Sequence, residues 1–472
     1  MADRDPAIHR DAARCPGPGW EEILREDLIP PPAFMAEDRY RYLGSEPIDA
    51  KRYHDPAFFR AEMEKMWPFV WQFAAREEDM PEPGDYVTYD NAGRSYLIVR
   101  QPDGEVRAFH NVCLHRGRKL ATESGMAEKF VCPFHGFAWN TDGSLRDIPC
   151  RWDFGHLSDE RMKLPQASVA RWDGYIFVRE KDEGPTIEAF LAPLPEFFTR
   201  WRHEDCETIA WVGKVVDANW KITMEAFMES YHAYMTHPQL LPFTGDANAA
   251  YHVLGKHVNV NYTPFGTISP HVAGTERPEQ WIVEEFVKYN GRSSDNYDPE
   301  KDQFNITVPE GESARHALGA AMRESSQRAF GGDYSAVSES ELLDALVFNV
   351  FPNFAPWGGF MPNIVYRWRP WPDQDRCLME VRVLARRQDG AEPRPPMTMH
   401  LLEDGQTWAD APELGALGAV VDQDMENMEL THQGLKCSAN GLVELGDYQE
   451  VRIRHFHQTL DTYLERSGGA LR

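Results

Sequence analysis

The chain has few cysteines, fewer basic than acidic residues, and no long hydrophobic run. Its seven cysteines are scattered over 472 residues, and so sparse and odd a set argues against a disulfide framework and for a reducing compartment. No apolar run approaches the ~20 residues that cross a bilayer. The first residues also lack the apolar stretch of a signal peptide. These absences exclude a membrane-spanning or disulfide-stapled protein, and we expect a cytoplasmic one.

Basic residues are outnumbered by acidic ones. The sequence has 49 Lys and Arg against 75 Asp and Glu, a formal net charge of −26 at pH 7. Such a surface repels DNA, RNA and anionic lipid, so we expect neither a nucleic acid nor a membrane as a partner. The hydrophobic content of 42% and the charged content of 26% are ordinary for a globular protein.

The length allows two or three domains with sizeable cores. Residues 1–50 are rich in proline and charge, and we expect them to form an N-terminal arm. After a first helix, β signals dominate up to residue 180, whereas 181–472 mixes strands and helices. Within that last segment, the polar and charged stretch 277–345 is interpreted as an insertion.

Hydrophobic periodicity predicts individual elements along the chain. Two hairpins with Asp-Gly turns are expected, at 95–109 and 137–148. The other expected strands are 171–179, 208–216, 252–262, 346–351 and 376–386, with a connector at 185–200. The expected helices are 51–66, 218–236, 410–434 and 447–466.

Two short motifs each join one cysteine to one histidine: Cys113-Leu-His115 and Cys132-Pro-Phe-His135. Each motif lies on a loop beside a predicted hairpin. Two cysteines and two histidines suit a Rieske [2Fe–2S] centre, in which the cysteines hold one iron and the histidines the other. Zinc is the alternative, but zinc ribbons favour Cys-x₂-Cys knuckles, whereas here each motif supplies one ligand of each type.

At these residues the chain resembles the Rieske family, whose pattern is a Cys-x-His motif followed by a Cys-x₂-His motif. The resemblance implies that the cluster ligands are Cys113, His115, Cys132 and His135. The chain departs from the family at Phe134 and Phe137, where relatives usually have Tyr and Trp. Without the hydroxyl at position 134 one hydrogen bond near a ligand is missing, so we expect a slightly lower reduction potential.

A second set of possible ligands follows about a hundred residues downstream. On a continuous helix Glu225, Glu229 and His232 share one face. His237 lies roughly 140° further around such a helix, so the two histidines could not share an ion there. Pro238 pushes His237 out of the α region and ends the helix, which allows the chain to bring His237 back towards His232.

Two histidines need a carboxylate to complete the facial triad of non-haem Fe(II). The segment Val421–Met428 offers Asp422 and Asp424. From spacing alone, a solvated acidic helix face is the better explanation of this segment. The spacing of the histidines also differs from the His-Glu-x-x-His helix of zinc proteases.

Over residues 50–465 the chain resembles the catalytic alpha subunit of the Rieske non-haem iron oxygenases, the aromatic ring-hydroxylating dioxygenases. The family pattern is Asn-Trp-Lys, here at 219–221, then an acid three residues before the first histidine, a second histidine and a distant Asp. The resemblance implies iron ligation by His232, His237 and Asp424, with Asp422 as the fallback.

The resemblance also assigns catalytic roles to Glu229 and Asn219. Glu229 stands where the family has an acid that bridges the cluster of one subunit and the iron of the next. Most relatives have Asp there, and Glu occurs among quaternary-amine monooxygenases. Asn219 lies close to the iron in relatives, although a helix N-cap explains it about as well. Glu225 is more simply a solvated helix residue, and His455 and His457 are expected at the surface or a subunit contact.

The implied fold is α+β: a small all-β Rieske domain at 51–180, then a helix-grip catalytic domain at 181–472 with an antiparallel sheet around a long helix. One [2Fe–2S] cluster and one mononuclear Fe(II) are the implied cofactors. The chain has no Gly-rich dinucleotide motif and no all-cysteine cluster, so NAD(P)H must be oxidised elsewhere. The expected electron-transfer partners are a ferredoxin, a flavin reductase or both. A head-to-tail homotrimer is implied, with or without a small beta subunit.

The expected activity is O₂-dependent hydroxylation of a small apolar or aromatic substrate, with cis-dihydroxylation favoured. A Rieske monooxygenase or demethylase acting on a quaternary amine or methoxy compound is the alternative. A non-catalytic Rieske or zinc-binding protein is the competing class. Residues expected to line an apolar pocket are Phe227, Met228, Leu240, Phe243, Phe351, Phe354, Trp357 and Phe360, and the stretch 277–345 is expected to act as a lid.

Overall fold

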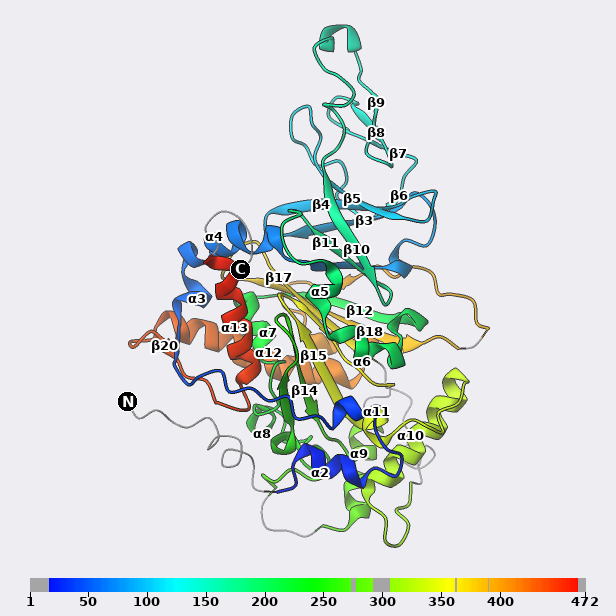
Figure 1. The fold of residues 1–472 in the computed structure, drawn as a ribbon, viewed down its shortest axis with the longest axis vertical. Coiled ribbons are helices and arrows are strands. Elements are labelled where there is room, and N and C mark those ends of the chain that lie inside the picture. Colours follow the sequence, from blue (N-terminus) through cyan, green and yellow to red (C-terminus); the bar gives the residue numbers. More distant parts are fainter. Residues whose placement is uncertain (1–16, 273–276, 292–305, 361–362, 389, 466–472) are drawn as a thin grey trace.

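The computed structural model describes residues 17–272, 277–291, 306–360, 363–388 and 390–465. It has two parts that are stacked along the long axis of the molecule (Figure 1). The upper part is almost entirely β, and the lower part combines a large sheet with helices. Within these ranges, no helix is both long and apolar enough to cross a membrane.

The upper part contains a seven-stranded antiparallel sheet in the order β2-β11-β10-β5-β4-β3-β6 and a three-stranded antiparallel sheet. The strands of the larger sheet are β2 (Gln72–Arg76), β3 (Asp85–Asn91), β4 (Arg94–Arg100), β5 (Val106–His110), β6 (Gly125–Met126), β10 (Gln166–Trp172) and β11 (Tyr175–Arg179). Those of the smaller sheet are β7 (Lys129–Val131), β8 (Ala138–Asn140) and β9 (Leu145–Asp147). The smaller sheet lies near the upper end of the molecule, away from the helices of the lower part (Figure 1).

Both predicted hairpins are confirmed as the antiparallel pairs β4–β5 and β8–β9. The prediction of one strand over 171–179 is wrong, because the chain reverses inside it. Trp172 pairs with Tyr175 across a tight turn, and Gly174 there has a φ of +80°. The Asp173-Gly174 pair is a typical hairpin turn signal. It reverses the chain here, although apolar residues continue on either side.

The lower part is built on an eight-stranded sheet in the order β13-β14-β15-β16-β17-β18-β12-β19, antiparallel except between β12 and β19. Its strands are β12 (Cys206–Val216), β13 (Ala250–Val253), β14 (Val258–Thr263), β15 (Ala345–Val350), β16 (Phe354–Pro356), β17 (Asn363–Pro370), β18 (Cys377–Arg386) and β19 (His400–Leu401). Helix α7 (Trp220–Glu225) packs on β17 and β18, and the long helix α12 (Ala416–Lys436) packs on α7. The predicted α+β fold class is confirmed.

Several predicted boundaries are corrected in the lower part. The expected strand at 252–262 is two strands, β13 and β14. The expected connector at 185–200 holds two helices, α5 (Ile187–Leu191) and α6 (Leu194–Trp201), whose apolar side chains are buried. Strand β17 was not predicted.

Two of the predicted helices also differ in extent. The helix expected at 51–66 is divided into α3 (Lys51–His54) and α4 (Pro56–Lys65), because Asp55 caps α4 by accepting the Ala57 N–H. The last helix, α13 (Val451–Leu464), packs against β13 and β14. His455 and His457 are therefore buried, at 8% and 1% exposure, and their prediction as surface residues is wrong.

The stretch 277–345 contains helices α9 (Glu279–Gly291), α10 (Ala314–Phe330) and α11 (Glu339–Leu343), and residues 292–305 lie outside the described ranges. These helices enclose an apolar cluster of their own, which includes Ile282 and Leu318. The stretch thus forms a small core beside the sheet, which its polar composition did not indicate.

Residues 17–50 lie along the lower part of the molecule (Figure 1). Helix α2 (Trp20–Glu26) buries Trp20 in the main core. Strand β1 (Ile48–Asp49) pairs with β20 (Leu442–Val443) near the C-terminus.

An ionic network joins the upper and lower sheets. Glu380 of β18 accepts hydrogen bonds from Arg367 and Arg369 of β17, and all three side chains are buried. Arg367 also donates to the backbone oxygens of Phe73 and Ala74 in β2. The network therefore fixes the β-rich part on the eight-stranded sheet.

Candidate functional site

The two Cys–His loops have the same backbone hydrogen bonds, although histidine occupies a different position in each. Cys113 donates its N–H to Arg118 O at 2.8 Å and accepts from Gly117 N at 2.9 Å. In the second loop, Cys132 makes the same two bonds with Phe137 O and Gly136 N, at the same distances. The two loops thus form a symmetric pair around their cysteines.

Glycine at the fourth position after each cysteine makes this turn possible. Gly117 and Gly136 have φ values of +81° and +80°, a left-handed conformation that side chains with a Cβ rarely adopt. The Cys-x-His-x-Gly and Cys-x-x-His-Gly spacings therefore encode the same loop, which explains why the motif was readable in the sequence.

Side chains of the quartet gather at the tip of the upper part. The thiols of Cys113 and Cys132 are buried, and the rings of His115 and His135 have centroids 4.7 Å apart. Burial raises the pKa of the Cys113 thiol, and contact with the Cys132 thiol raises it further. The Nδ1 atom of His115 is buried without a hydrogen-bond partner. Two adjacent buried thiols and an unsatisfied imidazole nitrogen fit a bound iron–sulfur cluster.

Phe134 and Phe137 differ in their surroundings. Phe134 is 54% exposed, and the Arg116 guanidinium lies 5.1 Å from its ring centroid. Phe137 is buried and stacks on the His115 ring at 4.5 Å. Phe137 therefore shields a histidine of the quartet, whereas Phe134 faces solvent at the tip.

The second set of ligands does not lie on one continuous helix, so that prediction is wrong. Helix α7 ends at Glu225, and the chain turns before the short helix α8 (Ala233–Thr236) begins. Glu229 lies in the turn and accepts the His232 N–H at 2.9 Å. The side chain of Glu229 thus shapes the turn that presents His232.

The Asn-Trp-Lys motif begins helix α7 and attaches it to neighbouring segments. Asn219 accepts the Lys221 N–H at 3.0 Å as the N-cap and donates its amide to Gln374 O. Lys221 forms a fully buried ion pair with Glu62 of α4 at 2.7 Å. These contacts account for Asn219 and Lys221 as structural residues of α7.

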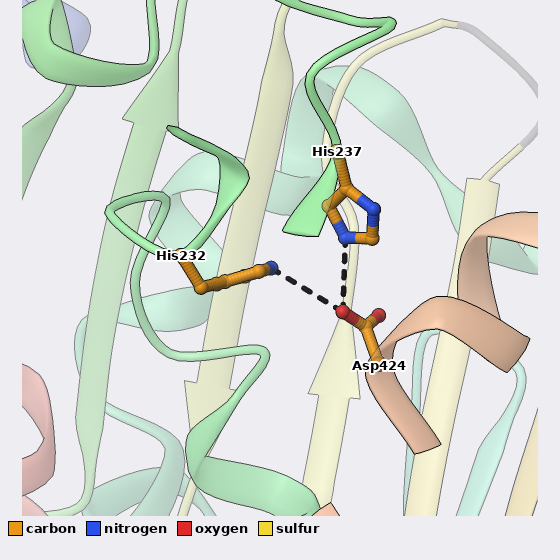
Figure 2. A group of neighbouring side chains, drawn as sticks. All are labelled: His232, His237 and Asp424. Carbon is orange, nitrogen blue, oxygen red and sulfur yellow. Dashed lines mark ion pairs between the residues drawn. The ribbon is translucent and has the colours of Figure 1, made fainter. Parts of the chain in front are cut away.

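His232, His237 and Asp424 converge, as Figure 2 shows. Asp424 Oδ1 lies 2.9 Å from His237 Nε2 and 3.5 Å from His232 Nε2. One ligand atom from each side chain lies within 4.8 Å of the others. Two imidazoles and one carboxylate in this arrangement form the facial triad typical of non-haem Fe(II) sites.

Each histidine is oriented by an acceptor on its far nitrogen. His232 Nδ1 donates to Glu229 Oε1 at 2.8 Å, and His237 Nδ1 donates to Gln423 Oε1 at 2.9 Å. A proton on Nδ1 leaves the Nε2 lone pair free to face Asp424. Gln423 was not identified from the sequence, although it directly precedes the predicted ligand.

The charges in this group also fit a bound cation. Burial lowers the pKa of His232, but the carboxylates of Glu229 and Asp424 outweigh it and raise that pKa to about 9. Asp424 Oδ1 is buried without a well-directed hydrogen bond. A divalent cation would satisfy this oxygen. Asp422 points elsewhere, since it accepts the N–H groups of Trp408 and Ala409.

Glu225 is not the solvated residue that was expected. Its carboxylate accepts hydrogen bonds from Tyr53 at 2.9 Å and from His457 at 2.8 Å. A cavity of about 300 Å³ lies beside this group and is also lined by Glu229, His232 and Asp424.

An aromatic wall stands next to the metal-ligand group. Phe227 packs on Tyr366 at 4.6 Å and on Trp368 at 5.6 Å. Burial raises the pKa of Tyr366, and the negative charge of the Asp424 carboxylate raises it further. Of the predicted pocket residues, Phe227 and Trp357 belong to this wall, whereas Phe351 and Phe354 lie in the main core.

Family models match two stretches of this chain. The model described as "Ring hydroxylating alpha subunit (catalytic domain)" matches residues 195–466, and the model described as "Rieske [2Fe-2S] domain" matches residues 70–157. The chain belongs to the Rieske ring-hydroxylating oxygenase family. The cofactors expected from the sequence, a [2Fe–2S] cluster and a mononuclear iron, are those of the two matched domains.

This chain spans about half the length of the curated relatives that it matches. The glycine betaine monooxygenase oxygenase subunit of Chromohalobacter salexigens is 32% identical over 248 residues, which cover 50% of this chain and 53% of the relative. The large oxygenase component of the naphthalene 1,2-dioxygenase system of Pseudomonas aeruginosa is 33% identical over 195 residues, 40% of this chain and 43% of the relative.

Solved structures share the fold over most of the chain. The apo form of the quaternary ammonium Rieske monooxygenase CntA has a TM-score of 0.60 at 17% identity, covering 89% of this chain and 96% of that one. Naphthalene 1,2-dioxygenase with indole bound has a TM-score of 0.61 at 20% identity, covering 89% and 92%.

Proposed function

We propose that this chain is the oxygenase component of a system that uses O₂ and electrons from a separate reductase or ferredoxin to hydroxylate a small organic substrate. The observation that carries the proposal is the convergence of His232, His237 and Asp424 in a chain that also carries a two-Cys, two-His tip. A non-catalytic Rieske or zinc-binding protein would not need the second group, which disfavours that class.

In the proposed assignment, Cys113 and Cys132 bind one iron of the cluster, and His115 and His135 bind the other. The ligands of the mononuclear iron are His232, His237 and Asp424. When bound, this iron supplies open coordination positions at which O₂ is activated. Glu229 accepts the His232 Nδ1 proton and so keeps the Nε2 lone pair directed at the ion. A catalytic role for Asn219 stays a prediction.

The proposed assembly is a head-to-tail homotrimer, with or without a beta subunit. Tyr231, Tyr234 and Met235 are exposed on either side of His232, at 51%, 44% and 77%. At the cluster tip, Phe134 and Trp152 are exposed at 54% and 83%. Two apolar patches, each beside one metal group, favour contact between the tip of one copy and the α8 region of another.

The substrate faces the wall formed by Phe227, Tyr366 and Trp368. An arene would stack on these rings, and cis-dihydroxylation is the favoured reaction. A quaternary ammonium group would bind the same ring faces through cation–π contacts. The glutamate at position 229 and the likeness to a glycine betaine monooxygenase support this second candidate.

The first test is the metal content of the purified protein. About three irons and two acid-labile sulfides per chain, with a Rieske-type EPR signal after dithionite reduction, are expected. Zinc without sulfide would contradict the proposal. A product screen under ¹⁸O₂ with a reductase, an arene panel and a quaternary-amine panel then separates the two reactions. A diol that carries both oxygen atoms indicates dihydroxylation, and an aldehyde with a demethylated amine indicates monooxygenation.

A further inference from the structure

Arg452, in helix α13, is a buried cation without a carboxylate partner in the described part of the chain. Its side chain is 0% exposed. Burial lowers the pKa of Arg452 to about 9, while the charges of Tyr251 and Glu229 act to raise it. Because an unpaired buried charge is unfavourable, a guanidinium in this place must use its N–H groups fully in hydrogen bonds.

The guanidinium bonds in three directions. Its Nε donates to Asn259 Oδ1 at 2.7 Å, and Nη2 donates to Val347 O at 2.9 Å. Nη1 donates to Asn261 Oδ1 and, at 2.9 Å, to Met228 O. Asn259 and Asn261 belong to β14 and Val347 to β15, whereas Met228 lies in the turn between α7 and α8. Arg452 therefore links the sheet to that turn.

The same turn is held by a second set of sheet residues. Tyr251 Oη accepts the Ser230 N–H at 3.1 Å, and Asn261 Nδ2 donates to Ser230 Oγ at 3.1 Å. Glu229, which orients His232, lies between these two anchored positions. Neither Met228 nor Ser230 can shift without breaking bonds to the sheet or to α13.

We propose that Arg452 is a positioning residue for the mononuclear metal site: by holding the Met228 carbonyl, it fixes the turn from which Glu229 orients His232. The inference rests on the proposed function, since it assumes a metal bound by His232. Lysine cannot replace this arrangement, because its single ammonium lacks the planar fork that reaches both asparagines and two carbonyls.

The test is Co(II) affinity of the full chain after the mononuclear site has been stripped with a chelator, with the cluster left in place and oxidised. Changes in residues that orient metal ligands typically weaken metal binding 10–100-fold. We expect R452M and R452K to raise the Kd for Co(II) within that range. The Co(II) EPR signal should also change, while the EPR signal of the reduced cluster stays as in the wild type.

Arg454 provides a matched control on the same helix. It is 5% exposed, and it donates to Glu46 O and Leu445 O, away from the turn. R454M should lower thermal stability but leave the Kd for Co(II) unchanged. Y251F removes the acceptor of the Ser230 N–H and should weaken Co(II) binding, so it keeps the proposal testable if R452M does not fold.

Wild-type Co(II) affinity in R452M, or in Y251F where R452M is insoluble, would overturn the proposal. An equal loss of Co(II) affinity in R454M would also overturn the proposal, because the effect would then come from a general destabilisation of α13. If the wild type itself bound no Co(II) at His232, the proposed function would fail first, and this role with it.

Discussion

The imidazole of His237 is oriented by the amide of a single neighbouring residue. Gln423 accepts the Nδ1 proton at 2.9 Å and is itself held by the Gln239 amide at 2.7 Å. In Q423L this acceptor is lost, and we expect Fe(II) affinity of the mononuclear site to fall 10–100-fold. Anaerobic Fe(II) titration of the stripped protein measures it.

Q423E is the matched variant, because a carboxylate still accepts the imidazole proton. It should keep Fe(II) affinity close to that of the wild type. Equal weakening in Q423L and Q423E would show that side-chain shape, and not the hydrogen bond to His237, is what matters at this position.

Position 134 offers a test at the cluster. A hydroxyl in F134Y would add a donor near the exposed face of the tip, where Phe134 is 54% exposed. Hydrogen bonds to cluster ligands raise the reduction potential. We expect an increase on the order of tens of millivolts, since a tenfold change in a one-electron equilibrium is about 59 mV. Redox titration of the two proteins followed by EPR measures it, and equal potentials would contradict the expectation.

Single residues were predictable to different degrees. The Cys–His quartet was readable because its ligand types and spacings are local. Asp424 was not separable from Asp422 by spacing, since both lie on helix α12 and only packing decides which carboxylate turns inward. Gln423 and Arg452 gave no signal at all, because their partners lie far away in the sequence.

At the scale of elements, the interrupted helix between residues 218 and 236 was the main error. The segment has helical periodicity throughout, but α7 ends at Glu225. Tertiary bonds from Tyr251 and Arg452 to the turn outweigh the local preference for helix. Strand β17 was missed for a similar reason, because it is buried on both faces and has no clear alternation.

Strands β17 and β18 carry a prediction about stability. Burial raises the pKa of Glu380, but Arg367 and Arg369 outweigh it and lower that pKa to about 2. E380Q would leave two buried guanidinium groups without their shared carboxylate. We expect the free energy of unfolding at pH 7 to fall by about 3–5 kcal/mol, measured by urea denaturation.

The sign of the pH dependence follows from the lowered pKa. Glu380 titrates near 4.3 in the unfolded chain and at about 2 in the folded one. Its contribution is therefore present above pH ~4.3 and is lost as the pH falls through about 2. The difference in free energy of unfolding between the wild type and E380Q should therefore shrink over that pH interval. E324Q, which breaks an exposed pair with Arg328, is the control and should change stability by less than ~0.5 kcal/mol.

For the whole molecule, the exposed patch of Tyr231, Tyr234 and Met235 beside His232 predicts an effect on assembly. Met235 is 77% exposed in the single chain, so M235K should not destabilise the monomer. If the patch receives the cluster tip of another copy, the charge should dissociate the proposed trimer and lower turnover. Light scattering and activity at matched iron content measure this.

L28K is the control for M235K, because Leu28 is also exposed, at 61%, but lies far from the ligand group in the sequence. It should leave mass and turnover unchanged. A trimeric and fully active M235K would rule out the proposed contact.

Domain order and fold class were predictable because two motif sets lie in separate stretches of sequence. Burial was less so. His455 and His457 of helix α13 were expected at the surface or a subunit contact, yet both are buried, as is Arg452. Polar composition indicates the surface only where no distant polar partner exists, and Asn259 and Glu225 are such partners.

The placement of residues 17–50 has a consequence for biosynthesis. Asp27 forms a buried ion pair with Arg315 at 2.7 Å and accepts the Ser340 N–H, and Tyr40 bonds to Asp447 O. These contacts join segments that leave the ribosome hundreds of residues apart, so residues 17–50 can dock only after their distant partners have been made. The β-rich cluster domain pairs its strands within residues 72–179 and can fold before the rest of the chain is made. The catalytic domain can close only once β20 and α13 have left the ribosome. The group of His232, His237 and Asp424 joins segments almost 200 residues apart, so it is expected to form after the cluster domain.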